Sequence, residues 1–141
     1  DNVAVKLLYE PNNKDNNIAV EADRGRLIQV ISNLLDNAIK FTKEGTISII
    51  TEEKDSKVVV SVKDTGTGID PEILPRLFSK FATKSYSGTG LGLFICKSIV
   101  EAHGGSIWAE NNSDGKGATF SFTLPLSKIS TQIGIGGREI K

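Results

Sequence analysis

The order of hydrophobic patterns along the chain predicts an α/β sandwich of two layers. We expect a mixed, mostly antiparallel sheet of about five or more strands, with three helices on one face. Two observations carry this prediction. Two pairs of strand-like segments are each joined by a short polar turn, which is typical of antiparallel hairpins. Segments with apolar residues at helical spacing lie before and between these pairs, and such helices pack on one side of a sheet.

The first third of the chain predicts two strands followed by a long helix. Residues 3–10 (VAVKLLYE) alternate loosely between apolar and polar, and residues 18–22 (IAVEA) form a second, shorter run. Asp23 is expected to cap the helix, because a carboxylate at this place accepts hydrogen bonds from the free amides of the first turn. Apolar residues recur at helical spacing over residues 27–39, and Gly45 is expected to end the segment.

The two predicted hairpins lie in the middle and near the end of the chain. The first joins residues 46–53 to residues 57–64, and the second joins residues 106–112 to residues 118–126. Each has a short turn of polar residues and glycine between two runs rich in β-branched or aromatic residues. Trp108 and Phe120, which lie in the strands of the second hairpin, are expected in the core.

Two further helices are expected between the hairpins. An Asp-Pro-Glu tripeptide begins at Asp70 and combines an N-cap, a proline at the first helical position and an acidic first turn. A short helix is therefore expected up to about Phe78. Residues 82–88 have no apolar period and predict a flexible loop, and residues 90–103 predict the last helix.

The composition predicts one domain over residues 1–126 and a flexible tail over residues 127–141. Lys and Arg number 17, as do Asp and Glu, so nonspecific nucleic-acid binding has little electrostatic support. No apolar stretch is long enough to span a bilayer, which predicts no membrane contact by this domain. A single cysteine, Cys96, fits a reducing, cytoplasmic compartment. The chain begins at Asp1 and lacks methionine, so we expect a fragment of a longer protein or a processed chain, and the parent protein could carry a membrane anchor.

Three polar side chains share one face of the long predicted helix. Asn33, Asn37 and Lys40 are spaced four and three residues apart, beside the apolar stripe. Polar groups next to a core need partners, and a metal-bound polyphosphate would satisfy all three, since amide oxygens suit Mg²⁺. The alternative is that the asparagines bond to nearby backbone, and the spacing alone leaves both interpretations open.

A carboxylate followed by two glycines ends the third predicted strand. Asp64 could accept a hydrogen bond from an amine such as that of adenine, while Gly66 and Gly68 would let a flat ring come close. A plain Asp-Gly turn is the alternative, and this stretch alone favours it.

The last predicted helix is preceded by a run of alternating glycines. Gly88, Gly90 and Gly92 place flexible backbone before a helix N-terminus, where anions bind, although a turn without a ligand is the alternative. No strand precedes these glycines and no Gly-Lys-Ser/Thr follows, which argues against a dinucleotide fingerprint and a P-loop. His103, near the end of this helix, is expected to cap it as a cation, and Cys96 is expected in the core.

Five motifs together resemble a known family. In this order, the chain is similar to the catalytic and ATP-binding domain of sensor histidine kinases, in the superfamily that includes DNA gyrase, a heat-shock chaperone and the mismatch-repair MutL proteins. The resemblance covers roughly residues 3–126. It rests on NLLDNAIKF (33–41), DTGTGID (64–70), LFSKFATK (77–84), GTGLGL (88–93) and GKGATF (115–120).

The resemblance implies the Bergerat ATP-binding fold, with ATP and Mg²⁺ as ligands. It implies catalytic roles for Asn33, Lys40 and Lys84, with Asn37 as the metal ligand and Lys84 on a short lid. The lid lacks an arginine found in many relatives, so Lys84 would carry more of the phosphate contact. The implied nucleotide-binding set is Asn33, Asn37, Lys40, Phe41, Asp64, Gly66, Gly68, Ile69, Phe81, Thr83, Lys84, Gly88, Thr89, Gly90, Leu91, Gly92, Leu93 and Thr119.

The resemblance also implies what this domain does and with which partners. Superfamily members that hydrolyse ATP carry a glutamate where Asn33 stands, and an amide cannot act as a base, so slow hydrolysis is expected. The γ-phosphate would pass to a histidine on a separate dimerisation and phosphoacceptor domain of the same protein, and then to a response-regulator receiver domain. An anti-sigma-type serine kinase of the same fold and a non-catalytic nucleotide-binding interaction module are the alternatives.

Overall fold

The computed structural model describes residues 5–12, 20–80 and 91–126 of the chain. Its elements are the strands β1 (Val5–Asn12), β2 (Gly45–Lys54), β3 (Lys57–Asp64), β4 (Ile107–Asn111) and β5 (Ala118–Pro125), the helices α1 (Arg24–Phe41) and α3 (Gly92–Ala102), and the short 3₁₀ helix η1 (Leu74–Arg76). The predicted tail over residues 127–141 lies outside the described residues.

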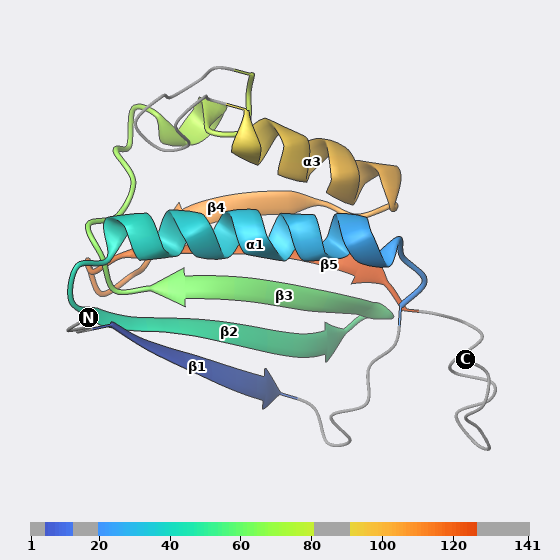
Figure 1. Cartoon of the computed structure of the whole chain (residues 1–141), viewed down its shortest axis with the longest axis horizontal. Coiled ribbons are helices and arrows are strands. Elements are labelled where there is room, and N and C mark those ends of the chain that lie inside the picture. Colours follow the sequence, from blue (N-terminus) through green and yellow to red (C-terminus); the bar gives the residue numbers. More distant parts are fainter. Residues whose placement is uncertain (1–4, 13–19, 81–90, 127–141) are drawn as a thin grey trace.

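A five-stranded sheet and a layer of helices make up the fold. The strands follow the order β1-β2-β3-β5-β4, with β1 parallel to β2 and every other neighbouring pair antiparallel. Both α-helices lie on the same face of this sheet (Figure 1). The predicted two-layer sandwich with a mixed, mostly antiparallel sheet is thereby confirmed. Within the described ranges, no helix combines the length and apolarity needed to cross a membrane.

The N-terminal strand pairs differently from what a chain of successive hairpins would give. β1 runs parallel to β2, in a register from Val5 opposite Gly45 to Asn12 opposite Glu52, and α1 is the crossover between them. Parallel neighbours require such a crossover. The strand expected at residues 18–22 is wrong for residues 20–22, which lead into the helix without strand pairing, while residues 18 and 19 lie outside the described residues.

Helix α1 begins and packs as its sequence predicts. The Asp23 carboxylate accepts a hydrogen bond from Arg26 N at 3.1 Å, which confirms the expected N-cap. Its inner face buries Val30, Leu34 and Ala38 in the core between helix and sheet. The helix ends at Phe41, well before Gly45. Gly45 instead opens β2 with φ +139°, at a point where a Cβ would lie 2.1 Å from Thr65 Oγ1.

Both predicted hairpins are present. β2 and β3 are joined by Asp55 and Ser56 with φ of 52° and 65°, the backbone signs of a type I′ turn. In the second hairpin, the β5 residues Phe120, Phe122 and Leu124 are buried, as expected for Phe120. The prediction for Trp108 is wrong: it is 38% exposed, because Ile107 and Ala109 pack on the core and the side chain between them faces the other way.

The helix expected over residues 70–78 is replaced by turns. Asp70 accepts from Glu72 N at 2.9 Å, as a cap should, and one α-type bond joins Leu74 N to Asp70 O at 3.1 Å. The chain then tightens into the 3₁₀ helix η1. Pro75 within it has no N–H to continue the α pattern, which explains why the helix stops after one turn. Phe78 packs edge-to-face on Phe120, with ring centroids 6.2 Å apart.

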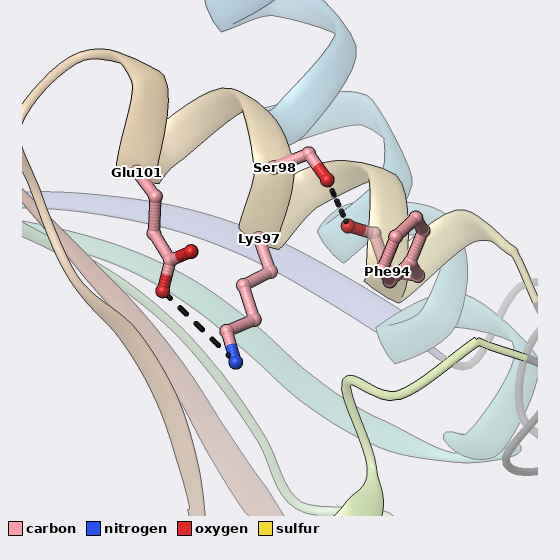
Figure 2. A network of polar contacts seen from close by, with 4 residues as sticks. All are labelled: Phe94, Lys97, Ser98 and Glu101. Carbon is pink, nitrogen blue, oxygen red and sulfur yellow. Dashed lines mark hydrogen bonds and ion pairs between the residues drawn. The ribbon is translucent and has the colours of Figure 1, made fainter.

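Helix α3 has an apolar inner face and a polar outer one. Leu93, Cys96 and Val100 are buried against α1 and the sheet. On its outer side, Lys97 and Glu101 form an ion pair with an N–O distance of 4.0 Å, and Ser98 donates to the Phe94 carbonyl (Figure 2). These exposed contacts support the helix locally and contribute little to overall stability.

His103 joins the end of α3 to the start of α1. Its Nδ1 is 2.8 Å from Ile99 O, and its Nε2 accepts a hydrogen bond from Asp23 N at 3.0 Å. A ring nitrogen that accepts carries no proton, so this pattern belongs to the neutral ring with hydrogen on Nδ1. His103 caps α3 as predicted, but the expected cationic form is wrong for this arrangement.

Candidate functional site

Two adjoining hollows open where the C-terminal half of α1 meets the start of α3 and the end of β3. The larger cavity, of about 440 Å³, is lined by Asn33, Asp36, Asn37, Ile39, Lys40, Gly92 and Leu93. The smaller pocket has a volume of about 10 Å³ and is lined by Asn37, Phe41, Asp64, Gly68, Ile69, Ala118 and Phe120. Asn37 belongs to both linings, so the two hollows meet at its side chain.

The polar face predicted on α1 lines the larger cavity. Asn33, Asn37 and Lys40 all contribute to its wall, which confirms that helical spacing brings them together. Asn37 is only 7% exposed, and its side chain makes no hydrogen bond to any other residue that the structure describes. A buried amide of this kind is costly unless a ligand completes it. Its oxygen suits Mg²⁺, which takes few protein ligands and fills its shell with water and phosphate oxygens.

Asn33 is held by α3 as well as facing the cavity. Its Nδ2 lies 3.5 Å from Gly92 O and 3.6 Å from Cys96 Sγ. The alternative of bonding to nearby backbone is therefore partly realised for Asn33, while Oδ1 remains as the acceptor it can offer. Burial raises the pKa of the Cys96 thiol to about 11, against the weaker lowering effect of the Asn33 hydrogen bond. Cys96 thus stays a neutral core residue, as predicted.

The N-terminus of α3 adds positive polarity to the same cavity. Gly92 and Leu93 form its first turn and line the wall, and no side chain of a described residue caps the amides of this turn. Such amides and the helix dipole favour an anion. Leu91 precedes the helix at the N-cap position. These features support the anion-binding interpretation of the glycine-rich stretch over that of a turn without a ligand.

Asp64 is the charged group of the smaller pocket. It is the last residue of β3 and is 3% exposed. Its Oδ1 accepts hydrogen bonds from Gly66 N at 2.9 Å and from Ala118 N at 3.2 Å. Burial raises the pKa of this carboxyl above its usual range, and the two backbone hydrogen bonds oppose the rise. Oδ2 receives no hydrogen bond from any described residue, so it is the oxygen available to a donor in the pocket.

The two glycines after Asp64 pack closely on neighbouring backbone. A Cβ at Gly66 would lie 2.1 Å from Phe41 O, and Gly68 adopts φ +82° with its Cβ position 3.0 Å from Asn111 Oδ1. They therefore let the loop lie against the end of α1 and the end of β4. Gly68 and Ile69 also line the pocket, as the resemblance implies, whereas Gly66 is not part of its lining.

Thr119 is not brought into the pocket. Its hydroxyl donates to Asn112 Oδ1 at 2.6 Å, while its strand neighbours Ala118 and Phe120 line the pocket. Side chains alternate along a strand, so a shift of one residue exchanges the two faces. Ala118 is thus the β5 residue next to the carboxylate.

The remaining site residues fall in two groups. Asp36, Ile39, Ala118 and Phe120 line the hollows although the motifs did not single them out. For Asp36 a signal exists, since it lies three residues after Asn33 and four before Lys40, on the same side of α1. The predicted residues Phe81, Thr83, Lys84, Gly88, Thr89 and Gly90 lie outside the described residues.

Comparison with known proteins places the chain in a family. The model of the histidine kinase-, DNA gyrase B-, and HSP90-like ATPases matches residues 22–128. Sensor protein SrrB of Staphylococcus aureus strain NCTC 8325 is 48% identical over an alignment of 110 residues, which covers 73% of this chain and 19% of SrrB. The chain therefore spans about a fifth of the length of this relative.

Solved structures of histidine kinases share the fold. The nucleotide-free catalytic domain of histidine kinase ThkA superposes with a TM-score of 0.74 at 41% identity, over 87% of this chain and 80% of that one. ThkA in complex with response regulator protein TrrA superposes with a TM-score of 0.70 at 42% identity, over 86% of this chain and 34% of that one. Full-length ShkA in complex with AMPPNP superposes with a TM-score of 0.76 at 31% identity, over 87% of this chain and 26% of that one. The chain belongs to the histidine kinase-, DNA gyrase B-, and HSP90-like ATPase family, and the relatives it matches are sensor histidine kinases.

Proposed function

We propose that this chain binds Mg–ATP and donates the γ-phosphate to a histidine of a separate phosphoacceptor domain. One observation carries the proposal: a pocket with a buried carboxylate opens next to a larger cavity whose wall includes Asn33, Asn37 and Lys40. The buried amide of Asn37, which makes no hydrogen bond to any described residue, lies where the two hollows meet. A nucleotide has the matching chemistry, a flat base with hydrogen-bond donors joined to a chain of phosphates.

The base end is assigned to the smaller pocket. Asp64 Oδ2 would accept from the exocyclic amine of adenine, while Phe41, Ile69 and Phe120 offer apolar surface to the ring. The pocket is narrow as it stands, with room for about one water molecule, so the walls must part slightly to admit a base. A full-length relative of this fold, ShkA, has been solved in complex with AMPPNP, which supports a nucleotide as the ligand.

The phosphates are assigned to the larger cavity. Lys40, the free amides at the start of α3 and the amides of Asn33 and Asn37 would surround them. Asn37 would hold Mg²⁺, whose charge would offset that of the phosphate oxygens and align the terminal group. Lys84, on the predicted lid, would approach the same phosphate.

The transfer step needs a nucleophile from outside this chain. A neutral imidazole nitrogen would attack the γ-phosphorus as the bond from phosphorus to the β,γ-bridging oxygen breaks, which leaves ADP. The second ring nitrogen would then release its proton to a base or to water. Asn33 and Lys40 would orient the γ-phosphate. An amide at position 33 takes no proton from water, which favours transfer over hydrolysis.

Two partners follow from this proposal. The histidine would lie on a dimerisation and phosphoacceptor domain of the same protein, within the part of the protein that this chain does not span. A response-regulator receiver domain would be the later acceptor, and the complex of ThkA with the response regulator protein TrrA supports this order. Such a phosphorelay would operate in the cytoplasm, which is the location we propose for this domain.

Transfer to a separate acceptor tests the proposal directly. The chain would be mixed with its phosphoacceptor domain and γ-labelled ATP, and the product tested for acid-labile, base-stable phosphohistidine. We expect label on the acceptor with the unchanged chain and more than about tenfold less with Asn37→Ala, which removes the metal ligand. Ser32→Ala is the matched control, since it shortens an exposed side chain of the same helix that lines neither hollow.

The chemical stability of the product separates the alternatives. Acid-stable phosphoserine on an added protein would favour the serine kinase, and tight ATP binding with no transfer to any acceptor would favour the interaction module. Full transfer by Asn37→Ala would remove the metal role of this residue.

A further inference from the structure

Two consecutive asparagines hold the smaller pocket from outside. Asn111 is the last residue of β4 and Asn112 follows it, and neither side chain lines the pocket. Yet both side chains bond to the backbone of residues that do. Their part in the site is therefore to be sought in how they place Asp64 and the loop after it.

Asn111 binds one wall of the pocket through two hydrogen bonds. Its Oδ1 accepts from Ile69 N at 2.7 Å, and its Nδ2 donates to Ile69 O at 2.9 Å. The amide thus pairs with both backbone groups of one residue, as a neighbouring strand would. Because Ile69 ends the loop that starts at Asp64, this pair fixes the far end of the loop against the sheet.

Asn112 binds the near end of the same loop. Its Nδ2 donates to Asp64 O at 2.9 Å and to Lys116 O at 2.8 Å, so both amide hydrogens are used. Its Oδ1 accepts from Thr119 Oγ1 at 2.6 Å. The hydroxyl of Thr119 therefore fixes the orientation of the amide that holds the backbone of Asp64.

The same backbone is confined from the other side. A Cβ at Gly117 would lie 2.0 Å from Asp64 O and 2.6 Å from Asp64 C, so the turn between β4 and β5 packs directly on Asp64. Ala118 N and Gly66 N fix its Oδ1. With the backbone and one oxygen held, the carboxylate that lines the pocket has little freedom to turn.

We propose that Asn111 and Asn112 are positioning residues that set the base selectivity of the pocket. This inference rests on the proposed nucleotide function and extends it. Asn112 would fix the place of the carboxylate, and Asn111 the width of the gap between the carboxylate and the Ile69 wall. The ligand selected is a nucleotide whose planar base presents an exocyclic amine to Asp64, in preference to the same nucleotide without that amine.

The test compares two nucleotides that differ by that amine. Affinities of the whole chain for ATP and for purine riboside triphosphate, which has hydrogen in place of the amine, would be measured by titration calorimetry in Mg²⁺. We expect Asn112→Ala and Asn111→Ala to lower the ratio of the two affinities by about three- to tenfold, the effect of one misplaced hydrogen bond. Thr119→Val, which removes only the bond that orients Asn112, should lower it less.

A loss of stability alone would give a different pattern. His103→Ala is the control, because it breaks contacts at the opposite ends of α1 and α3 and should lower the melting temperature without changing the affinity ratio. An unchanged ratio in the three pocket variants would overturn the inference, whether or not both affinities fell together. If the unchanged chain binds no ATP, the proposed function fails and this inference fails with it. If asparagine variants do not fold, Thr119→Val decides alone.

Discussion

Asp64 is a buried carboxylate whose surroundings oppose its charge. The side chain is 3% exposed, and burial raises its pKa in spite of two backbone hydrogen bonds to Oδ1. A group whose pKa is raised in the folded state binds its proton more tightly there than in the unfolded chain. Its favourable contribution to stability is therefore present at low pH and is lost as pH rises through the raised pKa. At neutral pH, the buried charge of Asp64 therefore costs stability.

Replacing Asp64 by asparagine should separate these two effects. In Asp64→Asn, Oδ1 can still accept from Gly66 N and Ala118 N, while the new amide presents hydrogens to the pocket. We expect a higher melting temperature at neutral pH without nucleotide, with the difference from the unchanged chain shrinking as pH falls toward 4. We also expect weaker ATP binding. Thermal unfolding across this pH range and calorimetry measure the two. A lower melting temperature at every pH would contradict the argument.

The sequence predicted residues of the site where local geometry alone decides their place. Asn33, Asn37 and Lys40 fall together because the spacing within one helix fixes their common face. Thr119, which the resemblance places in the nucleotide-binding set, does not line the smaller pocket, because the side that a strand residue faces depends on its register with its neighbours. Asn111 and Asn112 had no local signal at all. Their partners lie 42 and 48 residues away in the chain, and only the fold brings them together.

At the scale of elements, α1 and α3 are joined at the end remote from the site. His103, at the end of α3, donates from Nδ1 to Ile99 O and accepts at Nε2 from Asp23 N, the N-cap of α1. One side chain therefore completes the last turn of one helix and the first turn of the other. The cavity lies at the opposite ends of these helices, where Asn33 faces Gly92.

His103→Ala should weaken the helix pair without affecting the site. The change removes two hydrogen bonds and leaves Asp23 N without its partner, so we expect a loss of about 1–2 kcal/mol in the free energy of unfolding. ATP affinity should stay the same, since neither partner lines a hollow. Urea unfolding and titration calorimetry measure these quantities. A large drop in affinity in the folded variant would show that the two ends of the helix pair are coupled.

A helix or strand can be predicted from the sequence when the residues that determine it lie within the element itself. The hairpins and the long helix have strong periods and caps of their own, and the structure confirms them. The run at residues 18–22 was too short for its pattern to distinguish a strand from a linker. The turn at residues 70–78 has a proper N-cap, but Pro75 stops the helix that the cap begins. The parallel pairing of β1 could not be predicted, because strand partners are fixed by the crossover helix.

For the whole molecule, the fold places the two hollows largely on different elements. The smaller pocket is lined mainly from β3, β5 and the loop after Asp64, whereas the larger cavity lies between α1 and α3. Asn37 is the residue common to both. Under the proposed function, the sheet would hold the base and the helices would handle the phosphates. Changes on the helices could then alter the reaction while leaving nucleotide binding intact.

Asn33 is the residue at which this separation can be tested. It lines the cavity, and its Nδ2 is committed to Gly92 O and Cys96 Sγ. Because its side chain is an amide, it has no group that could take a proton from water. Asn33→Glu would place a carboxylate at the same wall. We expect steady-state ATP hydrolysis by the chain alone to rise roughly tenfold or more, toward the about 10²–10⁴-fold that a positioned base contributes.

Asn33→Gln is the matched control for this change, since it lengthens the side chain equally but adds no base. ADP release would be followed in a coupled assay, with ATP affinity measured for each variant, so that weaker binding is not mistaken for slower chemistry. The Asn33→Glu and Asn33→Gln variants should bind ATP with affinities within a few-fold of each other, because the adenine is held in the other pocket. Their rates of ATP turnover should differ. Equal turnover at saturating ATP would mean that the absence of a base at position 33 is not what restrains hydrolysis. Hydrolysis would then be slow because the cavity keeps water away from the γ-phosphate. In that case, the unchanged chain would need its acceptor domain both to open the cavity and to supply the nucleophile.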